Sequence, residues 1–329
     1  MPRIEVLPEA TAIEAQAEET ILQALLRHDI LQAHICGGKG RCSTCRVLIL
    51  EGLPFCSPRT HREQRLAERL HFPPNIRLAC QTHLSGSIRL RRLIIDDEDL
   101  ECTDLTILKD QAAIVGTEKG IFILFADIRG FTTFAETLLP YDVVHVLNRY
   151  FNRMGRVIRH YHGHINAYMG DGLMALFEAE DPAQGAAWAV QAGLAMLTEV
   201  ERLQPYLQEL FHRTFDIRIG LHYGKVVTGA FGAAEQRKET VIGDAVNVAS
   251  RIEAANKQVG TRFLVSEAVY QFVQDKLEVG QRFEVNLPGK SQVHILYEVR
   301  GVLDNGNNGG KITAGGSAGA CHLPAQNNR

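Results

Sequence analysis

Four cysteines form the first group of side chains whose types and spacing suit chemistry. Cys36, Cys42 and Cys45 stand in the segment Cys-Gly-Gly-Lys-Gly-Arg-Cys-Ser-Thr-Cys, and Cys80 follows in Arg-Leu-Ala-Cys-Gln. Four thiolates can complete the coordination of two irons, and the glycines let the backbone fold closely around the sulfurs. A structural zinc site more often shows two pairs of closely spaced cysteines, whereas only Cys42 and Cys45 form one here. The spacing therefore favours an iron–sulfur cluster over zinc.

Two aspartates form the second group. Asp127 ends the apolar run Ile-Phe-Ile-Leu-Phe-Ala, and Gly130 follows it in a turn whose backbone N–H groups can hold phosphate. Asp171 stands between two glycines, as expected of a tight turn between strands. Mg²⁺ prefers one or two carboxylates together with substrate phosphates, and two such ions can stabilise both oxygens of an in-line displacement. The pair indicates metal-assisted chemistry on a phosphate.

A third motif adds an amide and a cation. Asn247 and Arg251 are four residues apart, so on a helix they share one face, and an arginine there can bind phosphate with two hydrogen bonds. For either aspartate alone we would prefer the interpretation that it caps a turn. The three motifs together, in this order, favour a catalytic role for the aspartates over the capping of turns.

The N-terminal elements that position the cysteines follow from periodicity. Thr20 is expected to cap a helix that begins at Ile21. A short polar helix is predicted at 62–70, and strands are predicted at residues 3–7, 46–50 and 87–91. Small strands around one helix indicate an α+β domain.

The aspartates and Arg251 are expected on a second set of elements. Residues 121–126 form a continuous apolar run, typical of a strand that is buried on both faces. Helical periodicity runs from Val143 to Val157 and from Ala183 to about Leu203. Further strands are predicted at 172–177, 215–222 and 225–230, with a hairpin at Tyr223-Gly224 joining the last two.

Length and composition set the domain organisation. The 329 residues exceed what one core usually serves, so we expect domains at 1–95 and 119–301 joined by a linker at 96–118. The Gly- and Asn-rich tail, 302–329, is expected to be disordered. The net charge is -3 with scattered Lys and Arg, so small-molecule and protein partners are expected, and neither nucleic acid nor a membrane. With no run of ~18 apolar residues, a cytoplasmic location is expected.

The segment that holds the four cysteines resembles the [2Fe–2S] ferredoxins. Its five residues between Cys36 and Cys42 are nearer to the adrenodoxin-type loop than to the plant-type loop of four. The resemblance covers about residues 3–93 and implies a β-grasp fold with Cys36, Cys42, Cys45 and Cys80 as cluster ligands.

The three motifs after residue 119 are similar to those of the class III adenylyl and guanylyl cyclases, over about residues 119–300. The resemblance implies a ferredoxin-like βαββαβ core that dimerises head to tail, with an active site at each interface. It implies two Mg²⁺ or Mn²⁺ ions on Asp127, Asp171 and the carbonyl of Ile128.

The same resemblance assigns residues to the nucleotide. The partner protomer would supply Asn247, which orients the ribose, and Arg251, which stabilises charge on the α-phosphate. Backbone amides near Gly130, Phe131 and Thr132 would hold the triphosphate.

Three positions depart from the family pattern. Ala167 stands where adenylyl cyclases usually have a lysine that contacts the purine. Thr240 stands where they usually have Asp, as in a subgroup often associated with bicarbonate response, and it is not the Glu of guanylyl cyclases. The family's Lys-Gly-Lys is Pro288-Gly289-Lys290, so the first lysine is absent and Lys290 is left as a triphosphate contact.

The sequence therefore predicts an adenylate cyclase that makes 3′,5′-cyclic AMP and pyrophosphate from ATP, regulated by the redox state of its cluster through a redox partner. Two alternatives stay open. One is an electron-transfer ferredoxin with a degenerate nucleotide-binding domain, and the other is a guanylate cyclase.

Other reactive residues receive structural interpretations. The alternating histidines 160, 162 and 164 are expected at the surface, and Trp188 is expected to pack. Cys56 is interpreted as a packing thiol, and Cys102 and Cys321 are unassigned.

Overall fold

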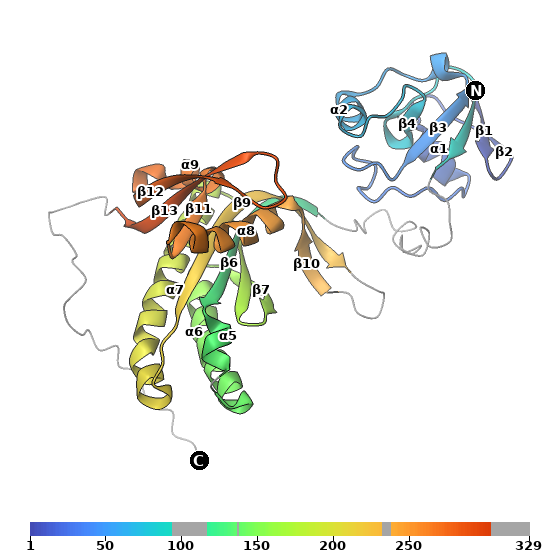
Figure 1. The fold of residues 1–329 in the computed structure, drawn as a ribbon. Coiled ribbons are helices and arrows are strands. Elements are labelled where there is room, and N and C mark those ends of the chain that lie inside the picture. Colours follow the sequence, from blue (N-terminus) through green and yellow to red (C-terminus); the bar gives the residue numbers. More distant parts are fainter. Residues whose placement is uncertain (94–116, 137, 232–237, 304–329) are drawn as a thin grey trace. The chain divides into compact units, whose positions relative to one another are not determined.

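The computed structural model describes residues 1–93, 117–136, 138–231 and 238–303. The chain divides into two compact units, residues 1–121 with 224–247 and residues 122–223 with 248–329. Figure 1 labels the helices and strands of the chain. Nearly all of the predicted linker and tail lie outside the described residues, as do Cys102 and Cys321.

The N-terminal domain is a five-stranded sheet packed against one helix, which is the expected β-grasp arrangement. Its strands run in the order β2-β1-β5-β3-β4, with β1 and β5 parallel and the other pairs antiparallel. The elements are β1 (Arg3–Leu7), β2 (Thr11–Glu14), α1 (Ile21–Arg27), β3 (Arg46–Glu51), η1 (Leu53–Phe55), α2 (His61–Arg69), β4 (Ile76–Leu78), η2 (Ala79–Gln81) and β5 (Ile88–Arg92).

Helix α1 begins where the sequence predicts. The Thr20 hydroxyl accepts a hydrogen bond from the Gln23 amide, and the Gln23 side chain returns to the Thr20 N–H, so the two form a capping box. The helix then buries Ile21 and Leu25 in the domain core.

The second sheet has strand order β12-β13-β11-β9-β6-β8-β7, and β10 pairs with β9. Its central connection, β6-α6-β7-β8-α7-β9, is the expected βαββαβ core. The elements are β6 (Thr117–Arg129), α5 (Phe131–Ala135), α6 (Pro140–His160), β7 (His164–Met169), β8 (Gly172–Phe177), α7 (Pro182–Phe211), β9 (Asp216–Phe231), β10 (Lys238–Ile242), α8 (Asp244–Val259), β11 (Phe263–Ser266), α9 (Glu267–Val273), η4 (Gln274–Lys276), β12 (Leu277–Asn286) and β13 (Val293–Val302).

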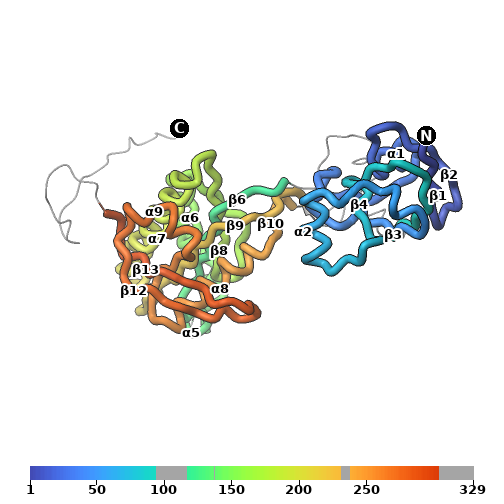
Figure 2. Tube along the Cα trace, turned by 90° about the horizontal axis from the view of Figure 1, so that it is seen from above, coloured from blue at the N-terminus to red at the C-terminus, as the bar shows by residue number. Residues whose placement is uncertain are grey.

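Both faces of this sheet are covered by helices. On β11, Phe263 and Val265 enter the large core with α6, α7 and α9, whereas Leu264 enters a second core with α8. Because side chains alternate along a strand, the two sets of helices lie on opposite faces (Figure 2). A strand covered on both faces is apolar throughout, which explains the buried run at the centre of β6.

Two sequence predictions for these elements are wrong. The expected hairpin at Tyr223-Gly224 is absent, because β9 continues as one strand from Asp216 to Phe231. A two-residue hairpin needs positive φ in its turn, and Gly224 does not have one. Helix α7 extends eight residues beyond Leu203 despite Pro205, because Leu207 continues the buried face past the proline.

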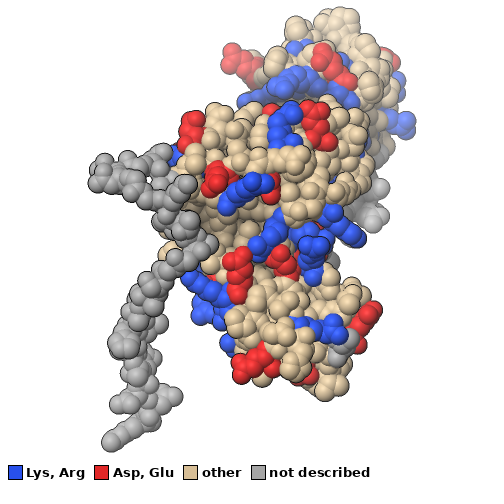
Figure 3. Space-filling model, turned by 60° about the vertical axis from the view of Figure 1, so that its left-hand side comes forward, with Lys and Arg blue, Asp and Glu red and all other residues tan. Residues whose placement is uncertain are grey.

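The face of the molecule in Figure 3 carries mixed charge. Acidic and basic side chains intermingle on the face drawn in Figure 3. Among the described helices, none is both long enough and apolar enough to cross a bilayer.

Candidate cluster site and active site

The four cysteines of the N-terminal domain meet in two pairs. The loop between α1 and β3 carries Cys36, Cys42 and Cys45, and η2 carries Cys80. The Sγ atoms of Cys45 and Cys80 are 3.4 Å apart, and the thiols of Cys36 and Cys42 are hydrogen-bonded to each other. In the described part of the chain, no three Cys, His, Asp or Glu side chains converge on one ion. Two pairs of thiols suit two irons that take two cysteines each.

The backbone of this loop stabilises negative sulfur. The Arg41 N–H donates to Cys36 Sγ, with the nitrogen 3.5 Å from the sulfur. The hydrogen bond from Cys42, aided by backbone N–H groups, lowers the pKa of Cys36 to about 5. Gly40 has φ +63°, and a Cβ there would lie 2.9 Å from the Gln81 side chain. These residues fit a thiolate-bound cluster.

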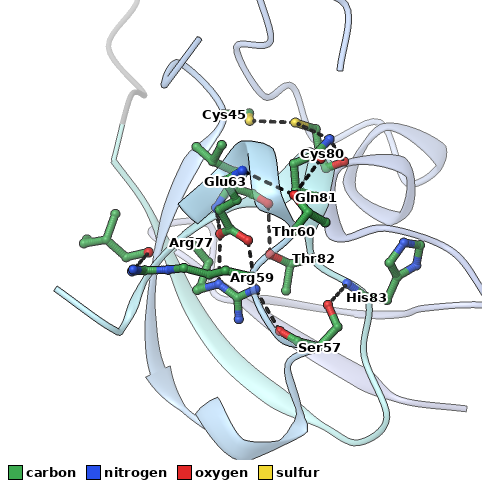
Figure 4. Close-up of polar contacts among 12 residues, drawn as sticks. Cys45, Ser57, Arg59, Thr60, Glu63, Arg77, Cys80, Gln81, Thr82 and His83 are labelled. Carbon is green, nitrogen blue, oxygen red and sulfur yellow. Dashed lines mark hydrogen bonds and ion pairs between the residues drawn. The ribbon is translucent and has the colours of Figure 1, made fainter. Parts of the chain in front are cut away.

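A buried ion pair supports the segment that leads to Cys80 (Figure 4). Arg77 donates from Nε and Nη2 to the two carboxylate oxygens of Glu63, at 2.9 and 3.0 Å, and the Leu78 N–H donates to Glu63 Oε1 at 2.8 Å. The side chains of Arg77 and Glu63 are only 5% and 1% exposed. The pair joins α2 to β4, and no sequence motif predicted it. Its one sequence signal is Thr60 three residues before Glu63, a helix-start pattern that gives no hint of Arg77.

In the second sheet, Asp127 of β6 and Asp171, in the turn between β7 and β8, come together. Strand β6 pairs with β8 so that Ala126 lies opposite Leu173, and the next step brings Asp127 beside Gly172. A Cβ on Gly172 would lie 3.2 Å from Asp127 Oδ1, so the missing side chain leaves room for the carboxylate. Burial, followed by the charge of Asp127, raises the pKa of Asp171 to about 6. Two close carboxylates of this kind suit divalent cations.

The segment after Asp127 also lies at this site. The side chain of Ile128 is buried in the core, and its backbone hydrogen-bonds Asp171. Gly130 has φ +72° and precedes α5, and a Cβ there would meet no heavy atom within 4 Å. Phe131 is half-buried and Thr132 is exposed.

An arginine that no sequence motif predicted also lies in this site. Arg218 Nη2 lies 3.6 Å from Asp127 Oδ2, and Arg218 Nε lies 3.1 Å from Glu253 Oε1 on α8. Burial, followed by the charge of Asp127, raises the pKa of Glu253 to about 7. The sequence holds one indication of this role, because Arg218 stands between Ile217 and Ile219 in an otherwise apolar strand. Its guanidinium offsets the negative charge of these carboxylates.

Asn247 and Arg251 lie one turn apart on α8, as predicted. Asn247 is exposed and Arg251 is half-buried, with its guanidinium against Gly289. The two positions expected to select the purine base lie on strands β10 and β7. Thr240 of β10 pairs with Gly229 of β9, and Ala167 of β7 pairs with Met174 of β8 beside a register shift.

The structural interpretations of the other reactive residues are confirmed where the structure describes them. The three alternating histidines are exposed, and the ring of His162 packs on Trp188 with centroids 4.3 Å apart. Cys56 is half-buried and packs against the N-terminal core.

The fold and these motifs define a nucleotide cyclase domain joined to a ferredoxin-type domain. Residues 115–300 match the family described as the adenylate and guanylate cyclase catalytic domain, and because this is more than half of the chain, the protein belongs to that family. Residues 4–85 match the 2Fe-2S iron-sulfur cluster binding domain. The expected fusion is confirmed.

Curated relatives match the cyclase part. The adenylate cyclase of Anabaena cylindrica is 37% identical over 183 residues, which are 54% of this chain and 36% of the relative. Adenylate cyclase 1 of Rhizobium meliloti (strain 1021) is 34% identical over 181 residues, which are 55% of this chain and 27% of the relative. The chain thus spans about a third of the length of these relatives.

Two solved structures share the fold, and one is described as a guanylyl cyclase and the other as an adenylyl cyclase. The guanylyl cyclase Cya2 is 32% identical, with a TM-score of 0.54, over 58% of this chain and 97% of its own. The adenylyl cyclase CyaB from P. aeruginosa is 28% identical, with a TM-score of 0.53, over 59% of this chain and 99% of its own.

Proposed function

We propose that this protein is an adenylate cyclase that converts ATP to 3′,5′-cyclic AMP and pyrophosphate. The observation that carries the proposal is the meeting of Asp127 and Asp171 beside Gly172, at the point where the family motifs predict two metal ions. These carboxylates, with the Ile128 carbonyl, would hold two Mg²⁺ or Mn²⁺ ions. When bound, the ions supply positive charge at the attacking and departing oxygens.

The remaining groups bind and orient the nucleotide. Backbone amides of Gly130, Phe131 and Thr132, together with Lys290, hold the triphosphate. Asn247 orients the ribose so that the 3′-oxygen bonds to the α-phosphorus as the bond to pyrophosphate breaks. The proton of the 3′-hydroxyl passes to solvent water. Arg251 stabilises the charge that develops on the α-phosphate. The exposure of Asn247 suits a residue that serves the active site of a second copy, so the proposed enzyme is a homodimer.

The choice of ATP rests on Thr240. Its side chain can hydrogen-bond the adenine amino group, and it lacks the acid expected at this position of a guanylyl cyclase. Ala167 removes one purine contact and weakens discrimination. Guanylate cyclase therefore remains the second candidate, favoured by the likeness to Cya2.

For the N-terminal domain we propose a regulatory cluster. Cys36, Cys42, Cys45 and Cys80 would hold the [2Fe–2S] cluster, which when bound supplies a one-electron redox change. A redox partner would set its state, and the state would bias how two catalytic domains meet. The competing function is electron transfer, with the cyclase domain serving only to bind nucleotide.

One assay separates these functions. Anaerobically purified protein is incubated with ATP or GTP and Mn²⁺ or Mg²⁺, with the cluster oxidised and reduced, and cyclic nucleotides are measured. We expect cyclic AMP in preference to cyclic GMP, at a rate that depends on cluster state. A rate independent of cluster state would remove the regulatory role, and no product from either nucleotide would favour electron transfer. An Asp171→Asn variant with full turnover would refute the metal assignment.

A further inference from the structure

The geometry points to a positioning role for Gly289, which fixes where the guanidinium of Arg251 lies. This inference rests on the proposed function, in which Arg251 stabilises charge on the α-phosphate. It concerns the turn from Leu287 to Lys290, where the sequence shows only the loss of a family lysine at Pro288.

The turn is rigid for reasons that its sequence supplies. The Lys290 N–H donates to the Leu287 carbonyl at 3.0 Å and closes a four-residue turn. Proline fixes φ at the second position, and Gly289 has φ +70° at the third, the pattern of a type II turn. Pro288 thus cannot supply the positive charge of the family's lysine, but it stiffens the backbone beside Arg251.

The guanidinium of Arg251 lies directly on this turn. A Cβ built on Gly289 would be 3.2 Å from Nη2, 3.6 Å from Cζ and 3.7 Å from Nη1 of Arg251. Three atoms of the guanidinium therefore face the glycine, and the nearest one is too close for a methyl group at its present position. Since the guanidinium ends a flexible side chain, an added methyl would move Arg251 rather than the backbone.

The helix that carries Arg251 and the turn that carries Gly289 share one core. Leu287, the first residue of the turn, is 2% exposed and packs in the same cluster as Val248 and Ile252 of α8. Arg251 directly precedes Ile252, so its backbone is held beside that core. Gly289, which faces its guanidinium, lies two residues after Leu287 of the same core. The helix that carries Arg251 and the turn that its guanidinium meets therefore belong to one packed core.

Gly260 offers a matched control. It has φ +74°, close to that of Gly289, and a Cβ there would meet no heavy atom within 4 Å. Gly260→Ala and Gly289→Ala thus impose similar backbone strain, but only the second places a methyl group against Arg251.

The test compares the two variants in the full-length holoprotein. We expect similar falls in Tm, while Gly289→Ala alone lowers kcat about tenfold, because displacement of a reacting group by less than an ångström has effects of this size. The KM for nucleotide should change less than about twofold, since the contact acts on the transition state. If Gly289→Ala does not fold, Gly289→Asn tests the same contact, because Asn tolerates positive φ.

A double-mutant cycle completes the test. With Arg251→Lys in place, adding Gly289→Ala should cause little further loss of kcat, because the guanidinium that it displaces is gone. Equal kcat for Gly289→Ala and Gly260→Ala, or fully additive losses in the cycle, would overturn the inference. A wild-type protein that forms no cyclic nucleotide would overturn the proposed function, and this inference with it.

Discussion

At the scale of single residues, the two active-site aspartates make metal binding sensitive to pH. Burial and the charge of Asp127 raise the pKa of Asp171 to about 6, above its ordinary 3.8. A metal ion must displace this proton, so we expect the Mn²⁺ concentration for half-maximal turnover to rise steeply as pH falls from 7 to 5. The same shift means that, without metal, this group favours the folded state increasingly as pH falls from about 6 to about 4. Metal titrations of turnover at fixed ATP check the prediction, and a constant requirement would contradict it.

Tyr150 gives a second prediction at this scale. Its side chain is fully buried on α6, and within the described residues its hydroxyl has no hydrogen-bond partner. Removing an unpaired buried hydroxyl relieves a desolvation cost, so Tyr150→Phe should leave the free energy of unfolding unchanged or raise it by about 1 kcal/mol. Tyr150→Ala, which also removes the ring packed against Phe215, should lower it by about 4 kcal/mol. Urea unfolding measures both, and a marked loss in Tyr150→Phe would show that the hydroxyl has a partner.

At the scale of elements, the ion pair between Glu63 and Arg77 joins α2 to the strand that leads to Cys80. Glu63→Gln keeps the shape but leaves a buried guanidinium without its counter-charge, so we expect a loss of about 3 kcal/mol in stability and faster loss of the cluster. Thermal unfolding and the decay of visible absorbance measure the two effects. Glu68→Gln, at an exposed position of the same helix, is the control and should behave as the wild type. Similar values for both variants would show that the pair contributes little.

At the scale of the whole molecule, the proposed homodimer shares each active site between two copies. Asp171→Asn and Arg251→Ala should each be nearly inactive alone. When the two are co-expressed, half of the dimers should be mixed, and each mixed dimer keeps one intact site, so about a quarter of the wild-type activity should return. Turnover assays of the co-purified pair measure this. Activity no higher than that of the single variants would place both residues in one copy's site.

The sequence by itself indicated a ferredoxin-type and a cyclase-type part, and it predicted their longer helices and the central strands β6 and β8, because periodicity, caps and glycine turns are local signals. It gave no prediction for shorter or edge elements such as β2, β4 and β11, or for the strand pair β12 and β13. It also placed Asp127, Asp171, Asn247 and Arg251, since their motifs stand at strand ends and on one helix face. Local signals failed at Tyr223-Gly224, where pairing with β10 extends the strand.

Only the tertiary structure decided which distant residues meet. Arg218 of β9 contacts Asp127 of β6 and Glu253 of α8. Arg77 contacts Glu63, which lies fourteen residues earlier in the chain. Arg251 lies on Gly289, 38 residues further along the chain. Such contacts depend on how strands pair and how helices cover them, and no repeat or local spacing in the chain encodes them.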